Sequence, residues 1–169
     1  MKKQALFFAV SLIIMIVIIS CQEKKEKIDQ AEEIAQIENV LDQYVIANEN
    51  QDFSIIENIW ANDDDIELIG TDSDELLTGW ESIKSAIRHQ FESFENTYIS
   101  VNDQQIHLNS TGNTAWFFET LNYNFLYKGE AMSFEGIRFT GVMLKRGDKW
   151  EIVHGHLSVP AEVDIESEE

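Results

Sequence analysis

The sequence contains a single cysteine, Cys21, among its 169 residues. One cysteine excludes an intramolecular disulfide and a metal site built from several thiolates. The stability of the folded chain must therefore come from a packed core, and residues 21–169 are enough for one domain with such a core. No internal repeat divides the sequence.

Basic residues are also scarce, with 12 Lys and Arg against 31 Asp and Glu and a formal net charge of −19. Nucleic acid is excluded as an expected partner, because phosphate binding needs a basic surface. Anionic lipid head groups should likewise be repelled by the acidic surface. We interpret the acidity itself as a contribution to solubility.

A long hydrophobic run is found at residues 5–19, after a short basic start. This run is shorter than the roughly 20 residues that a membrane-spanning helix needs. A basic start, a short apolar run and the small Ser20 before Cys21 form the layout of a signal peptide. The placement of Cys21 resembles the box of a bacterial lipoprotein, which implies a signal peptide over 1–20 and a lipid on Cys21. An uncleaved anchor is the alternative, and both predict an extracytoplasmic protein.

Two charged segments flank the expected domain. Residues 21–30 interleave Lys and Glu without aromatic residues, which predicts a tether between the lipid and the domain. Residues 162–169 form an acidic tail that we expect to be disordered. The folded domain is therefore expected over 31–161.

Apolar residues recur at helical spacing in three segments of the first half. These residues are, in chain order, Ile34, Ile37, Leu41, Tyr44 and Val45; Phe53, Ile56, Ile59 and Trp60; and Trp80, Ile83, Ile87, Phe91 and Phe94. Asp52 is the expected N-cap of the second helix, and Gly79 precedes the third. Residues 66–70 and 75–78 are expected to pair as a short hairpin between them.

The second half predicts strands near 97–109, 114–127, 131–145 and 149–159, separated by turn residues. Long strands joined by tight turns indicate an antiparallel meander. A helical half packed on such a sheet gives the α+β class.

The last of these strands carries the most informative pattern. Residues two apart in a strand share a face, so Trp150, Ile152, His154, His156 and Ser158 are expected on one side. Two imidazoles and a hydroxyl are costly to bury without partners. That side is therefore expected to meet water, a polar cavity or a subunit interface.

These motifs resemble, in their order and spacing, the nuclear transport factor 2-like superfamily. The match is to its SnoaL-like branch, which includes the association domain of calmodulin-dependent kinase II. The matching pieces lie at 40–45, 52–53, 60–63, 79–83, 138–140 and 147–150, and in the final His-x-His-x-Ser. The resemblance implies a cone-shaped, curved antiparallel sheet wrapped around the N-terminal helices, also called a cystatin-like roll, with a pocket inside. Fold alone does not imply chemistry, because this superfold hosts isomerases, dehydratases, binding modules and assembly domains.

Ketosteroid isomerase, a member of this superfamily, combines a tyrosine oxyanion donor with an aspartate base and a protonated aspartate. Tyr44 falls at the position of the tyrosine, Leu68 at that of the base and Thr140 near that of the second acid. Leucine cannot accept a proton, and the adjacent Glu67 should point to the other face of its strand. The isomerase mechanism is therefore not expected.

Candidate ligand-binding residues combine aromatic and polar side chains: Tyr44, Trp60, Trp80, Trp116, Glu119, Arg138, His154 and His156. The aromatic residues would form pocket walls, and Arg138, His154 and His156 would supply polar contacts. Core packing is the competing interpretation of the aromatic residues. A structural ion pair with Glu119 is the competing interpretation of Arg138. His154 and His156 are also candidates for acid–base catalysis, or for hydrogen-bonded structural positions.

Neither a metal nor a cofactor is expected. His154 and His156 lack a third ligand, and the Asp63-Asp64-Asp65 turn lacks the glycine and distal glutamate of a calcium loop. The sequence also has no glycine-rich phosphate loop and no serine-nucleophile elbow.

The sequence thus predicts a lipid-anchored domain that binds a small, partly apolar ligand. One alternative is an isomerase, lyase or hydrolase that uses His154 and His156, and another is a homo-oligomeric assembly module without catalysis. A homodimer is expected, through an outer sheet face opposite Arg138 and His154. Strand alternation assigns Phe139, Met143, Val153 and Leu157 to that face.

Overall fold

The computed structural model describes residues 28–161. The predicted signal peptide over 1–20, the lipid site at Cys21, most of the tether over 21–30 and the tail over 162–169 lie outside these residues. The elements are, in order, α2 (Gln30–Asn50), α3 (Phe53–Ile59), β1 (Glu67–Ile69), β2 (Leu76–Thr78), α4 (Trp80–Ser93), β3 (Phe94–Leu108), β4 (Thr114–Tyr127), β5 (Glu130–Arg146) and β6 (Lys149–Ser158). Within the described residues, no helix is both long and apolar enough to cross a membrane.

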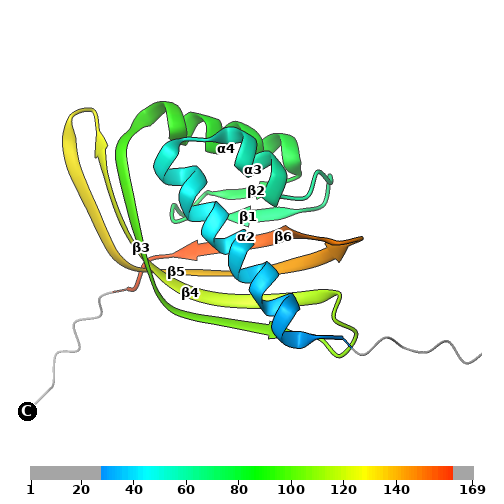
Figure 1. The fold of residues 1–169 in the computed structure, drawn as a ribbon. Helices are drawn as coiled ribbons and strands as arrows, with labels where there is room; N and C mark the ends of the chain where they lie inside the picture. The colour runs from blue at the N-terminus through cyan, green and yellow to red at the C-terminus, as the bar shows by residue number, and fades with distance from the viewer. Residues whose placement is uncertain (1–27, 162–169) are drawn as a thin grey trace, which may run out of the picture.

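One curved sheet organises the described chain, with its strands in the order β2-β1-β6-β5-β4-β3. Neighbouring strands are antiparallel except β1 and β6, which run parallel. The helices cover one face, and the long β4–β5 hairpin curls upward toward the level of α4 (Figure 1). This arrangement confirms the predicted α+β class and curved sheet.

Local irregularities in the long strands supply the curvature. The register shifts between Asn102 and Gln105 on β3 and between Leu121 and Tyr123 on β4. Asp103 adopts a φ of 50°, which lies in the left-handed region. A bulge adds an unpaired residue to one strand and bends it, so the sheet wraps around the helices instead of lying flat.

Helix α2 lies across the inner face of the sheet (Figure 1). It begins after Asp29, whose side chain accepts hydrogen bonds from the Ala31 and Glu32 amides, as expected of an N-cap. It ends at Gln51, which has a left-handed φ of 55°. The buried residues recur at helical spacing and form one stripe that packs on the sheet: Ile37, Val40, Leu41, Tyr44, Ala47 and Asn48.

Polar contacts fasten both ends of α2 to the sheet and to α4. Near its start, Glu33 accepts hydrogen bonds from the Lys145 ammonium at 2.5 Å and the Trp150 indole at 2.9 Å. Burial raises the pKa of Glu33, but these hydrogen bonds and the charge of Lys145 outweigh it and lower the pKa overall. At the other end, Glu49 accepts from the Ile99 amide at 2.8 Å, and the Gln51 amide donates to the Phe91 carbonyl at 2.6 Å.

The other two helices follow the predicted spacing. Asp52 caps α3 by accepting from the Ser54 amide at 3.0 Å, which confirms its predicted role. Gly79 stands before α4 with a φ of 81°, and a β-carbon there would lie 3.1 Å from the Asp64 carbonyl oxygen. Glycine is therefore favoured by both conformation and space.

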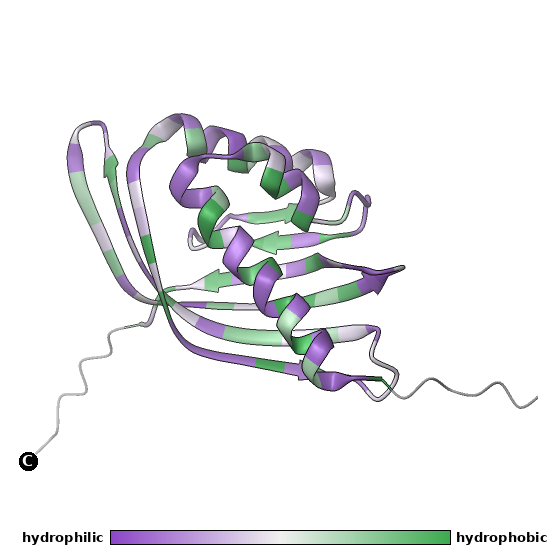
Figure 2. Ribbon diagram, in the orientation of Figure 1, coloured by the Kyte–Doolittle hydropathy of each residue, from purple (hydrophilic) through white to green (hydrophobic). Residues whose placement is uncertain are grey.

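Inner and outer faces alternate cleanly along β4. Its inner residues are Ala115, Phe117, Glu119, Leu121, Tyr123 and Phe125, all buried. Apolar segments of the strands and helices face one another in the space between sheet and helices (Figure 2). Phe139 of β5 lies in this core, with its ring centroid 4.8 Å from that of Tyr44 and 4.9 Å from that of Phe117.

Glu119 is the exception in this apolar layer, because its side chain is fully buried. One carboxylate oxygen accepts a hydrogen bond from the Gln104 amide at 2.8 Å, whereas the other has no partner among the described residues. Burial raises the pKa of Glu119, and the negative charge of Asp42 on α2 adds to that effect. The folded chain therefore binds a proton at Glu119 more tightly than the unfolded chain does.

This burial predicts a pH-dependent gain in stability for Glu119→Gln. With a raised folded-state pKa, wild-type stability is fully present below the ordinary carboxyl pKa and falls as the pH rises above it. We expect the variant to match the wild type near pH ~4 and to be about 1–3 kcal/mol more stable at neutral pH, because the neutral amide avoids the cost of burying a charged carboxylate. Urea unfolding at both pH values measures the difference, with exposed Glu130→Gln as the control. An advantage that does not grow with pH would contradict the buried charge.

Candidate functional site

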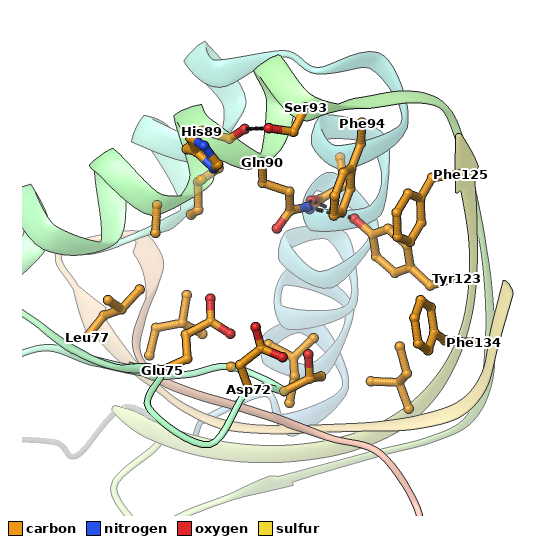
Figure 3. A pocket seen from close by; sticks show the side chains of 18 of the residues that line it. Asp72, Glu75, Leu77, His89, Gln90, Ser93, Phe94, Tyr123, Phe125 and Phe134 are labelled. Atoms are coloured by element: carbon orange, nitrogen blue, oxygen red, sulfur yellow. Dashed lines mark hydrogen bonds between the residues drawn. The ribbon is translucent and has the colours of Figure 1, made fainter. Parts of the chain in front are cut away.

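A cavity of about 920 Å³ opens between the inner face of the sheet, α2 and α4 (Figure 3). Its lining residues come from α2, α4, the β1–β2 hairpin and the strands β3 to β6. The lining residues include Tyr44 and Asn48 from α2, and Leu68, Asp72, Glu75 and Leu77 from the β1–β2 hairpin and its loop. The sheet and α4 add Ala86, His89, Gln90, Phe94, Tyr123, Phe125, Phe134 and Leu157. A volume of this size suits a small organic molecule.

Aromatic rings form one wall of the cavity. Phe94 and Phe125 stack with their centroids 3.9 Å apart, and Phe134 also stacks with Phe125, at 6.0 Å. Tyr123 meets Phe125 edge to face at 5.9 Å. The rings come from β3, β4 and β5, so the curl of the sheet gathers them at one end of the cavity (Figure 3).

A buried polar network lies behind this wall and joins α2, α4 and β4. The Gln90 amide donates to the Asn48 side-chain oxygen at 3.0 Å and to the Tyr123 hydroxyl at 3.1 Å. The Tyr123 hydroxyl in turn donates to the Asn48 oxygen at 2.9 Å, and the Asn48 amide donates to the Tyr44 carbonyl at 2.8 Å. Satisfied networks of this kind fix the spacing of the elements that they join.

Two of the tyrosines that line the cavity, Tyr44 and Tyr123, remain protonated over the physiological range. Burial raises the pKa of Tyr44, and the negative charge of Glu119 adds to the shift. Burial also raises the pKa of Tyr123, with a further contribution from Tyr44. The hydroxyl groups are therefore neutral hydrogen-bond donors and not anions.

Polar side chains with titratable groups face one another across the opening. The carboxylates of Asp72 and Glu75 point into the cavity from the loop between β1 and β2, and His89 lies opposite them on α4 (Figure 3). Leu68 of β1 also lines the cavity, whereas Glu67 lies on the other side of the strand. The expected orientation of this pair is therefore confirmed.

Of the eight ligand-binding residues predicted from sequence, Tyr44 alone lines this cavity. Trp60 is 1% exposed, and it forms a bridge to Ile152 of β6. Trp80 is 5% exposed and stacks on Phe53 with centroids 6.4 Å apart. Both tryptophans lie in the core, which agrees with the competing interpretation of these residues.

Arg138, His154 and His156 lie on the outer face of the sheet, which differs from their expected place inside the cone. For the two histidines, a bulge in β6 explains the difference, because Met143 pairs with Ile152 but Val142 pairs with His154. The extra residue shifts the alternation by one, so Trp150 and Ile152 face the core while both histidines face outward. Arg138 faces outward because it alternates with its buried neighbour Phe139 on β5.

The predicted dimer surface is also corrected, because the face opposite Arg138 and His154 is the inner face of the sheet. Phe139 and Met143 are fully buried in the core, and Leu157 lines the cavity, so these residues do not form an outer face. Glu119 and Arg138 also lie on opposite faces of the sheet, because Glu119 pairs with Phe139 and Arg138 with Thr120. The expected ion pair between them is therefore absent, and Gln104 is the partner of Glu119.

A shallow depression of about 400 Å³ occupies the outer face instead. It is lined by His107, Trp116, Phe117, Phe118, Thr140, Gly141, Val142 and His154. Trp116 is 48% exposed and stacks on His107 with centroids 5.6 Å apart. His154 reaches Glu67 at 3.4 Å between Nδ1 and Oε2.

Residues of the cavity that sequence reasoning missed lie mostly outside strands. Asn48 carried a usable signal, because it follows Tyr44 by one helical turn on the same apolar stripe. Gln90 carried the same signal after Ile83 and Ile87. Asp72 and Glu75 carried no such sequence signal, because the fold of their loop, and not a periodic pattern, decides where their side chains point. Among residues 28–161, no three His, Cys, Asp or Glu side chains gather as a metal site would need.

Comparison with known proteins places the chain in a family. Residues 37–162 match the profile described as the SnoaL-like domain. No curated protein matches the sequence.

Similar solved structures share the fold at low sequence identity. A nuclear transport factor 2-like superfamily protein from Salmonella enterica is 16% identical, with a TM-score of 0.72 over 82% of this chain and 99% of its own. A provisionally described calcium/calmodulin dependent protein kinase II association domain from Xanthomonas campestris is 22% identical, with a TM-score of 0.65 over 80% and 91%. A provisionally described scytalone dehydratase from Novosphingobium aromaticivorans is 14% identical, with a TM-score of 0.67 over 82% and 91%. The chain thus belongs to the SnoaL-like domain family, with the nuclear transport factor 2-like fold.

Proposed function

We propose that this chain is a lipid-anchored, extracytoplasmic SnoaL-like domain that binds a small, partly apolar molecule in the cavity beside α4. The cavity carries the proposal, because it combines an aromatic wall with neutral hydrogen-bond donors at a volume suited to such ligands. The tyrosine and amide groups would orient the ligand, and the rings of Phe94, Phe125 and Phe134 would remove its apolar part from water. No cofactor is needed for binding.

Anchoring rests on the N-terminal sequence. The apolar run over 5–19, followed by Ser20 and Cys21, supports cleavage before Cys21 and attachment of lipid to it. A net charge of −19 disfavours direct contact with anionic lipid, so the attached lipid would hold the domain at the membrane.

Assembly into a homodimer is a second candidate function, which the outer face of the sheet favours. Trp116 is half exposed there, beside Phe118 and Val142, and covering such apolar groups is favourable. Ligand binding inside the cone and association through the outer face use opposite sides of one sheet, so one chain can combine them.

Filling the cavity tests ligand binding. We expect the neutral fluorescent probe N-phenylnaphthylamine to bind the wild-type domain saturably. Ala86→Trp places a large side chain in the cavity from α4 and should weaken binding by at least about tenfold, or ~1.4 kcal/mol. Glu92→Trp, an exposed position on the same helix away from the cavity, is the matched control and should bind as the wild type does. Saturable binding that Ala86→Trp leaves intact would place the ligand elsewhere.

Metabolic labelling with an alkyne fatty acid tests the anchor. The full chain should incorporate label and sediment with membranes. Cys21→Ser should lose the label, because serine offers no thiol for lipid attachment. Ser20→Ala keeps a small residue before the cysteine and should retain the label. An unlabelled wild-type chain would refute the lipoprotein assignment.

Sedimentation equilibrium tests the dimer. We expect the wild-type domain to be dimeric and Trp116→Asp to be monomeric, because a charge would be buried without a partner in the apolar contact. Ile46→Asp changes a residue of similar exposure on α2, at 40%, and should stay dimeric. A Trp116→Asp variant that remains a dimer would exclude this face as the contact.

A further inference from the structure

We propose that the ligand of the cavity is an organic cation, with an amine or quaternary ammonium group next to an aromatic or apolar body. This inference deepens the proposed function and rests on it. Three features of the cavity support the inference. Two carboxylates lie at one end, an aromatic wall lies at the other, and the described lining contains no Lys or Arg.

The two carboxylates belong to Asp72 and Glu75, and both point into the cavity (Figure 3). Neither forms an ion pair with a residue that the structure describes. Among the described residues that line the cavity, none is Lys or Arg, and His89 is the single imidazole. The cavity therefore has a negative potential of its own, to which the net charge of −19 adds.

Gly70 fixes the direction of one of these carboxylates. The side chain of Glu75 lies directly over Gly70, so a β-carbon added there would fall 1.7 Å from Oε2 and 2.1 Å from Cδ of Glu75. A side chain at position 70 would occupy the place where the carboxylate now rests. The glycine thus leaves room for Glu75 to reach the cavity from its own loop.

The aromatic wall suits the same ligand. The faces of aromatic rings attract cations, and the rings also bury apolar surface. One ring of the wall, Tyr127, already meets a cation of the chain itself, with the Lys128 ammonium 4.9 Å from its centroid. Lys128 itself is not part of the cavity lining, so the interior stays without a resident positive charge.

Anionic ligands fit this cavity poorly. A carboxylate or phosphate would meet Asp72 and Glu75 with like charge and would find no Lys or Arg side chain among the described lining residues to pair with. Arg138, which the sequence predicted as a polar contact of the ligand, lies on the outer face of the sheet. The negative charge of Glu75 also contributes, after burial and Glu119, to the raised pKa of Tyr44, so the potential extends to the buried end of the cavity.

Three naphthalene derivatives of similar size test the inference by isothermal titration calorimetry on the wild-type domain. They are naphthylmethyl trimethylammonium, neutral naphthylmethanol and anionic naphthylacetate. We expect the cation to bind at least about tenfold more tightly than the neutral compound, and the anion to bind most weakly. Added salt should weaken the binding of the cation alone.

Variants of the loop between β1 and β2 test whether Asp72 and Glu75 cause the preference for the cation. Glu75→Gln combined with Asp72→Asn should lower the affinity for the cation about tenfold. The affinity for naphthylmethanol should change by less than about twofold. Gly70→Ala keeps every charge but displaces the Glu75 carboxylate, so it should also weaken the binding of the cation and not that of naphthylmethanol. Asp74→Asn removes one charge from the same loop outside the cavity lining and should change neither ligand.

The possible results separate this inference from the proposed function. If naphthylmethanol and N-phenylnaphthylamine bind but the cation gains nothing over them, the charge preference is wrong and the binding cavity stands. A preference that Asp74→Asn reduces as much as the double variant would reflect net charge alone and would also overturn it. If none of the probes binds, both proposals fail.

Discussion

The packing of one amphipathic helix across the inner face of the sheet is the constraint on which the rest of this structure depends. Helix α2 buries a single apolar stripe, and polar contacts of Glu33 and Glu49 fasten it near its two ends. Because the sheet is longer than the surface that one helix can cover, part of the inner face remains without a helix on it. The curl of the β4–β5 hairpin and the position of α4 turn that remainder into a cavity.

Polar groups inside the fold keep this cavity open and give it its chemistry. A cavity lined only by apolar side chains gains dispersion energy by collapsing. Here Asn48, Gln90 and Tyr123 satisfy one another's hydrogen bonds and tie α2, α4 and β4 together. Collapse would break that network, so the same contacts that stabilise the packing also maintain the cavity.

The two faces of the sheet carry different side chains, and a single bulge in β6 assigns the residues of that strand to them. Before the bulge, Trp150 and Ile152 contribute to the core; after it, His154 and His156 face outward beside the apolar depression around Trp116. Strict alternation along the sequence puts all four on one face, which is why the residues with the most recognisable chemistry were expected in the cone. An extra residue in a strand leaves no mark in the local pattern, because its position depends on pairing with the neighbouring strand.

Helical spacing, turn residues and strand lengths predicted the α+β class, the cap at Asp52 and the four long strands, because these features depend on local propensity and periodicity. The sequence also singled out Tyr44 as a cavity residue, through its place in a resemblance to a known family. Only the tertiary structure decided which face each strand residue occupies, and which side chains meet in the cavity. Asp72 and Glu75 line the cavity because chain folding brings their loop opposite α4 and the aromatic wall, and no local pattern encodes contacts between segments so far apart.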